Sequence, residues 1–128
     1  MAWCFEDETT KYTESVLTHL SEGAVALVPA IWPYEVTNVL IFAGRQKRIS
    51  QNKVIQFLRE LQSFDITIDP QNSSRIFQDV LSVAQMHKLT AYDAAYLELA
   101  LREGLPIATL DRGLRRAADA AGVKIHGR

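Results

Sequence analysis

Short unbroken apolar runs alternate along the chain with segments in which apolar residues recur at helical spacing. The runs "AVALV" (24–28) and "PIATL" (106–110) have the pattern of strands buried on both faces of a sheet. "DITID" (65–69), stopped by Pro70, and the short "VKI" (123–125) are further strand candidates. The pattern therefore predicts four short strands.

Helical spacing is found between and around these runs. It predicts helices over 9–23, 33–44, 50–64, 72–88, 91–103 and 112–122. Because parallel strands need helical crossovers, this alternation predicts a single α/β domain over residues 1–128. Its parallel β-sheet is expected to be flanked by helices on both faces.

This layout brings acidic residues to one edge of the sheet. Asp111 follows the run 106–110 and so lies at the carboxyl end of that strand. The helix 91–103 returns antiparallel to the strand over about 18 Å, which matches the strand's length and brings Asp93 to the same edge. Glu35, in the first turn after the run 24–28, reaches it in the same way. Open α/β sheets bind their ligands at this edge.

The surroundings of these acids favour a metal ion. Asp93 continues the apolar stripe of Leu97 and Leu101, whereas Glu98 and Arg102 are predicted to face solvent. The stripes that carry the acids contain no Lys, Arg or His, and clustered carboxylates need a counter-charge. An all-oxygen ligand set suits Mg²⁺ or Mn²⁺.

Each acid also has a purely local interpretation. Thr90 and Asp93 form a T-x-x-D capping box, in which Asp93 satisfies the start of its helix. Asp111 is a candidate N-cap of the next helix, and the positive end of a helix favours Glu35. The sequence leaves both interpretations open for each residue.

Composition narrows the function classes. The chain is 48% hydrophobic and 23% charged with a formal net charge of −1, so bulk charge indicates neither a nucleic-acid nor a membrane partner. The single cysteine, Cys4, fits a reducing, cytoplasmic location, and neither a membrane span nor a signal peptide is predicted. His19, His87 and His126 share no zinc-ligand spacing with Cys4.

Three stretches together resemble the PIN-domain family, and most closely its VapC-type toxins. They are "PYEVTNVL", "LTAYDAAYLELALREGLPIATLD" and "RGLRRAADAAGVKI". The resemblance implies an endoribonuclease that hydrolyses RNA phosphodiesters with Mg²⁺ or Mn²⁺, as the toxin of a type II toxin–antitoxin pair. It places Glu35, Asp93 and Asp111 as catalytic metal ligands, and Thr109 matches a threonine of the family motif. It further implies a homodimer and a VapB-type antitoxin as partner.

One departure from the family concerns the start of the chain. Family members open with a strand that ends in a D-x-S-type segment, whose aspartate is the first metal ligand. "MAWCFEDE" resembles the stretch after that segment, so the first strand and first acid are expected to be absent. An alternative function is therefore an inactive PIN remnant that dimerises or binds antitoxin. A phosphate-handling α/β domain is a third hypothesis.

An RNA substrate would require positive groups near the acids. Three arginines follow Asp111 in "DRGLRR" and are predicted to contact RNA phosphates, together with Thr109: Arg112, Arg115 and Arg116. A second basic cluster, equally consistent with a solvated face, comprises Arg45, Lys47 and Arg48. The two tyrosines beside Asp93, Tyr92 and Tyr96, are predicted to be core residues.

Overall fold

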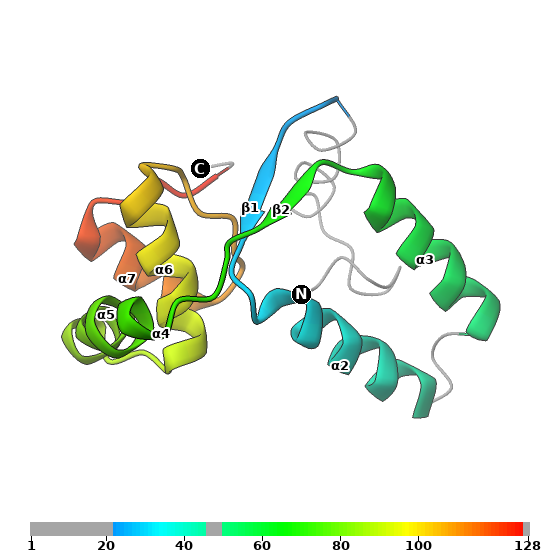
Figure 1. Cartoon of the computed structure of the whole chain (residues 1–128), viewed down its shortest axis with the longest axis horizontal. Helices are drawn as coiled ribbons and strands as arrows, with labels where there is room; N and C mark the ends of the chain where they lie inside the picture. Colours follow the sequence, from blue (N-terminus) through cyan, green and yellow to red (C-terminus); the bar gives the residue numbers. More distant parts are fainter. Residues whose placement is uncertain (1–21, 46–49, 127–128) are drawn as a thin grey trace. The chain divides into compact units, whose positions relative to one another are not determined.

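The computed structural model describes residues 22–45 and 50–126 (Figure 1). The chain divides into two compact units, Met1–Asp69 and Pro70–Arg128, each of which is described by itself. The predicted helix 9–23 lies outside the described residues, except for its last two positions, which form a turn. The prediction that the family's first strand is absent rests on the stretch 1–8, which also lies outside the described residues. One domain over 1–128 stays a prediction.

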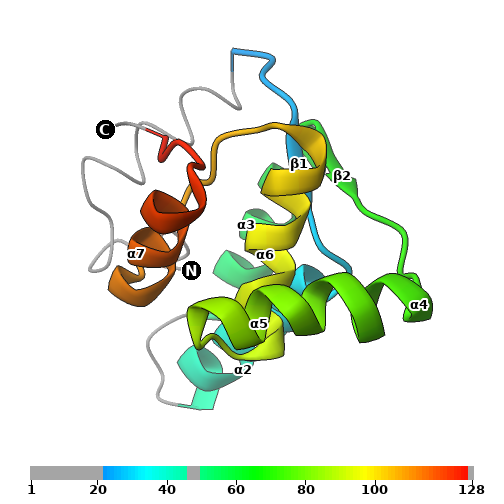
Figure 2. The same cartoon turned by 90° about the vertical axis from the view of Figure 1, so that its left-hand side faces the viewer.

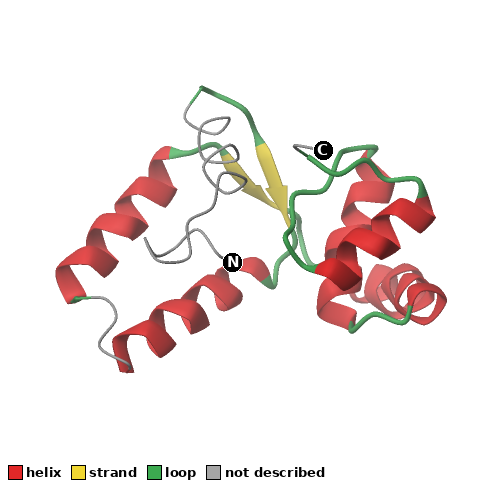
Figure 3. Ribbon diagram, turned by 180° about the vertical axis from the view of Figure 1, so that it is seen from behind, coloured by secondary structure: helices red, strands yellow, loops and turns green. Residues whose placement is uncertain are grey.

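The first unit contains a small parallel sheet (Figure 3). Its elements are β1 (Ala26–Val28), α2 (Trp32–Arg45), α3 (Gln51–Ser63) and β2 (Ile66–Ile68). Ala26 pairs with Ile66 and Val28 with Ile68, and Asp69 N–H donates to the Val28 carbonyl at 2.8 Å. The two predicted strands are therefore confirmed, each over three residues.

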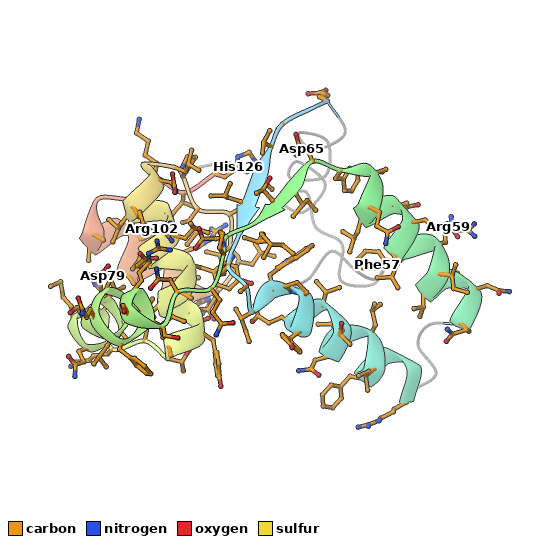
Figure 4. All side chains as sticks on the ribbon, viewed as in Figure 1. Phe57, Arg59, Asp65, Asp79, Arg102 and His126 are labelled. Carbon is orange, nitrogen blue, oxygen red and sulfur yellow. The ribbon has the colours of Figure 1, made fainter. Side chains whose placement is uncertain are left out.

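Local signals set the helices of this unit. Pro33 lies in the first turn of α2, where a missing N–H costs nothing. The Ser50 hydroxyl accepts from the Lys53 N–H at 3.3 Å and starts α3, as predicted. The buried core of the unit draws on both helices, with partly buried Phe57 packed against it (Figure 4); its buried members are Val36, Leu40 and Leu61.

The second unit is built mainly from helices (Figure 2). A first helix comprises α4 (Ser73–Arg75), the π-helical turn η2 (Ile76–Val80) and α5 (Leu81–His87), and it lies against α6 (Ala91–Glu103). The last helix is α7 (Arg112–Ala121). Left-handed residues end the helices, Lys88 after α5 and Gly104 after α6. The predicted bounds 72–88, 91–103 and 112–122 agree with these elements.

The predicted strands 106–110 and 123–125 are reduced to one parallel bridge, Ile107 with Ile125. Ile107 N–H donates to the Lys124 carbonyl at 2.9 Å, and His126 N–H to the Ile107 carbonyl at 2.9 Å. Pro106 has no N–H with which to extend this pairing. The bridge nevertheless anchors the core of the unit, whose buried members are Leu97, Ala100, Ile107, Leu114, Ala117, Ala118, Val123 and Ile125.

Two predictions on α6 are wrong. Glu98, expected on the solvent side, is 6% exposed, whereas Leu101, expected on the buried stripe, is 43% exposed. Glu98 is buried because Arg102 neutralises it through two hydrogen bonds, Nε–Oε1 at 2.9 Å and Nη2–Oε2 at 3.1 Å (Figure 4). Arg75 lies 4.0 Å from the same carboxylate.

The two tyrosines of α6 differ in burial. Tyr96 packs partly buried against the core, as predicted, but Tyr92 is 62% exposed and is not a core residue. Tyr92 lies in the first turn of α6. Among the described residues, no helix is both long and apolar enough to cross a lipid bilayer.

Candidate active site

Asp93 lies in the first turn of α6, and Thr90 is the N-cap of this helix. The Thr90 hydroxyl accepts a hydrogen bond from the Asp93 N–H at 3.2 Å. Thr90 has extended backbone angles, which start the helix immediately after it. The half of the predicted capping box in which Thr90 caps the helix is therefore formed. It leaves the Asp93 carboxylate half-buried at the positive end of the helix.

Asp111 is the N-cap of α7, as its local interpretation predicted. Its Oδ2 accepts from the Leu114 N–H at 2.8 Å, and its carbonyl accepts from the Arg115 N–H at 2.9 Å. The Asp111 N–H in turn donates to the Thr109 hydroxyl at 3.1 Å. Thr109 and the first turn of α7 therefore fix Asp111 from both sides.

The two aspartates interact electrostatically. Burial raises the pKa of Asp93 above its ordinary value, the negative charge of Asp111 raises it further, and only hydrogen bonding to the Thr90 side chain lowers it. No cationic side chain from the described ranges is among the groups that shift this pKa. We call Asp93 and Asp111 the acidic pair.

Glu35 belongs to the other unit, in the first turn of α2, and is half-buried there. Its N–H donates to the Ile31 carbonyl at 3.1 Å. The buried stripe of α2 is formed by Val36 and Leu40, while Phe42 is 60% exposed. Glu35 thus lies beside the buried stripe of its helix.

No three His, Cys, Asp or Glu side chains within 22–45 and 50–126 form a group that could hold a metal ion. The acidic pair supplies only carboxylate oxygens, and one of them, Asp111 Oδ2, already accepts from Leu114. Its mutual repulsion and partial burial are what a divalent cation would relieve. The donor set of the pair therefore fits Mg²⁺ or Mn²⁺ as a partial site.

The arginines after Asp111 differ from one another. Arg112 and Arg116 are exposed, whereas Arg115 is half-buried and donates from Nε to the Thr109 carbonyl at 2.7 Å. In the second basic cluster Arg45 is exposed, and Lys47 and Arg48 lie outside the described ranges. All three arginines of the first cluster were predicted to contact RNA phosphates. Only the position of Arg115 one helical turn after Asp111 distinguished it.

Gly113 lies beside Asp111 and was not among the predicted site residues. A Cβ built on Gly113 would lie 3.3 Å from Asp111 Oδ2. That distance is tighter than ordinary van der Waals contact, so a side chain here would press on the carboxylate. The absence of a side chain leaves room for Asp111.

The first unit joins two parallel strands through helices, and acids lie at the starts of α2, α6 and α7. These features define an α/β protein with an acidic candidate site. The sequence model of the PIN domain matches residues 1–120, and the chain belongs to the PIN-domain family. The predicted α/β PIN-like fold is thereby confirmed, as is the resemblance to VapC-type members.

Two relatives illustrate the similarity. "Ribonuclease VapC3" from Pyrobaculum aerophilum is 33% identical over 81 residues, which cover 63% of this chain and 62% of the relative. The chain therefore spans less than two thirds of that curated protein. The crystal structure of PAE2754 from Pyrobaculum aerophilum superimposes with a TM-score of 0.62 at 30% identity, covering 81% of this chain and 73% of the other.

Proposed function

We propose that this chain is a metal-dependent endoribonuclease that hydrolyses RNA phosphodiester bonds. The observation that carries the proposal is the acidic pair, in which the charge of Asp111 raises the pKa of Asp93 and no cationic side chain of the described residues is among the groups that shift it. A relative that covers most of this chain is a ribonuclease by name, which supports the same chemistry.

Asp93 and Asp111 of the second unit would hold Mg²⁺ or Mn²⁺, and Glu35 of the first unit stays a predicted ligand. When bound, the cation would lower the pKa of water and neutralise charge that develops on the phosphate. Thr90 and Leu114 hold the two aspartates in place through the hydrogen bonds that start their helices. The exposed side chains of Arg112 and Arg116 would bind the backbone phosphates of RNA, which orients the strand without selecting its sequence.

The same proposal extends to partners. A VapC-type member of the family would act as the toxin of a type II pair, silenced by a VapB-type antitoxin, as a homodimer in the cytoplasm. Co-expression with a candidate antitoxin encoded beside this chain, followed by co-purification, tests the pairing. Light scattering of the purified chain tests the dimer.

The test of activity is cleavage of a structured RNA pool with Mn²⁺ or Mg²⁺, comparing the parent chain with Asp93→Asn. Asp79→Asn is the matched control, because Asp79 is an exposed acid of the same unit on η2 (Figure 4). We expect cleavage by the parent and the control, and loss in Asp93→Asn by a factor of roughly 100 or more. Equal cleavage by all three would reveal a contaminant and reject the assignment. A folded but inactive parent would favour the non-catalytic binding module.

A further inference from the structure

Arg115 makes a contact that a phosphate-binding side chain does not require. Its Nε–H donates to the Thr109 carbonyl at 2.7 Å, six residues back along the chain, and the side chain is half-buried. A charge-assisted bond of this length is among the stronger hydrogen bonds in proteins. The guanidinium therefore ties the start of α7 to the loop that precedes it.

The loop tied in this way is the one that carries Asp111. The Thr109 hydroxyl accepts from the Asp111 N–H at 3.1 Å, and Asp111 Oδ2 accepts from the Leu114 N–H at 2.8 Å. Arg115 thus contacts the backbone of the same residue whose side chain holds the Asp111 amide. A shift of the Thr109 carbonyl would move the Asp111 backbone with it.

We propose that Arg115 is a positioning residue, which holds the Thr109–Asp111 loop so that the Asp111 carboxylate faces a bound cation. This inference rests on the proposed metal-dependent function. It differs from the role predicted from the sequence, in which Arg115 contacts RNA together with Arg112 and Arg116. Side chains that orient metal ligands commonly contribute about 10- to 100-fold to metal affinity.

The two roles predict opposite effects on the binding of a cation. Removal of a nearby positive charge lessens repulsion, so a purely electrostatic role predicts that Arg115→Gln binds Mn²⁺ more tightly, by up to roughly threefold. Loss of a positioning contact predicts weaker binding, by roughly tenfold or more. The sign of the change separates the roles without any measurement of RNA cleavage.

Mn²⁺ binding to the full chain, measured by titration calorimetry, would compare the parent with Arg115→Gln, Arg115→Lys and Arg116→Gln. Arg116→Gln removes the same charge from an exposed neighbour and should change the affinity by less than about threefold. Arg115→Lys keeps the charge but lacks the planar donor, so it should resemble Arg115→Gln. Circular dichroism checks that each variant is folded. Parent-like or tighter binding by both Arg115 variants would overturn the inference.

A second measurement separates this inference from the proposed function. Amide exchange of Leu114, followed by NMR in the metal-free chain, reports the bond to Asp111 Oδ2. Faster exchange in Arg115→Lys, but not in Arg116→Gln, supports the positioning role; unchanged exchange rejects it. If the parent binds no Mn²⁺, the proposed metal site fails. The Leu114 amide then still decides whether Arg115 holds the Asp111 side chain.

Discussion

Asp93, in the first turn of α6, and Asp111, the N-cap of α7, lie near enough for the charge of Asp111 to raise the pKa of Asp93. They are 18 positions apart in the sequence, so the folded unit creates the interaction. Partial burial and the like charge of Asp111 both oppose ionisation of Asp93, which destabilises the metal-free protein. Such local destabilisation is common where a protein must bind a cation.

Neutralising Asp93 should therefore stabilise the metal-free chain. The raised pKa means that the folded state disfavours ionised Asp93 relative to the unfolded state. The penalty is present above the folded pKa and disappears below the ordinary value of 3.8. We expect Asp93→Asn to gain less than about 1 kcal/mol at pH 7, since the carboxyl is half-exposed. Urea unfolding at pH 7 and pH 4 checks this, because the gain should shrink as the pH falls.

Asp79→Asn is the control for this effect. Asp79 is exposed on η2, so its substitution should change the free energy of unfolding by less than about 0.5 kcal/mol. A parent chain as stable as Asp93→Asn, or more stable, at pH 7 would contradict the unfavourable interaction between the two aspartates.

Gly113→Ala should weaken Mn²⁺ binding without lowering the stability of the protein. Alanine within a helix is normally better than glycine by about 1 kcal/mol. Here its Cβ would meet Asp111 Oδ2 at 3.3 Å, so the carboxylate must move. We expect weaker Mn²⁺ binding, by roughly three- to tenfold, together with unchanged or higher stability. Calorimetry and thermal unfolding measure the two effects.

Gly44→Ala is the matched control. Gly44 is also helical, in α2, but a Cβ there would meet nothing within 4 Å. It should change stability in the same direction and leave Mn²⁺ affinity unaltered. Equal metal affinity in the two glycine variants would show that the space beside Asp111 is unimportant.

The buried carboxylate on α6 should contribute more to stability than its exposed neighbour. Glu98→Ala leaves Arg102 and Arg75 without their buried partner, and we expect a loss of about 2–4 kcal/mol. Glu103→Ala removes a 3.3 Å contact of Arg102 Nη1 at the surface and should cost less than about 1 kcal/mol. Denaturant unfolding compares the two. Similar losses would mean that burial adds nothing to the Glu98 interactions.

The exposed arginines after Asp111 should set the salt dependence of RNA binding. Each phosphate contact to a single strand contributes about 0.7 to the slope of log K against log salt. Arg112→Ala and Arg116→Ala should each reduce the slope by about that amount, measured by fluorescence anisotropy in the cleavage-deficient Asp93→Asn chain. Arg59→Ala, an exposed arginine of α3 labelled in Figure 4, should leave it unchanged. Equal slopes in all variants would argue against phosphate contacts at α7.

The helix starts were predictable because their signals are local. Ser50, Thr90 and Asp111 each accept from an N–H three residues later, which a tetrapeptide specifies by itself. The left-handed glycine after α6 belongs to the same class of signal. The convergence of Asp93 and Asp111 followed from these helix starts and from the chain direction.

Features that depend on tertiary partners were not predictable. Glu98 is charged and therefore seemed solvated, and only the packing that brings Arg75 and Arg102 to it makes its burial tolerable. The run 106–110 has the composition of a buried strand, but within 22–45 and 50–126 only its residue Ile107 forms a bridge, to Ile125. The hydrogen bond from Arg115 to the Thr109 carbonyl could not be predicted, because every residue has a backbone carbonyl and no sequence motif marks this one as an acceptor.

Asp111 is the N-cap of α7 and, in the proposed site, a metal ligand. Only a few substitutions remove one of these two roles and keep the other. Asparagine can still accept from the Leu114 N–H but lacks the charge, whereas alanine loses both. An alanine scan would confound a weakened α7 with a lost ligand at this position. Asparagine isolates the charge, and serine, another good N-cap, tests the reach of the carboxylate. A substitution at residue 111 therefore has to satisfy both the first turn of α7 and, in the proposed site, the cation.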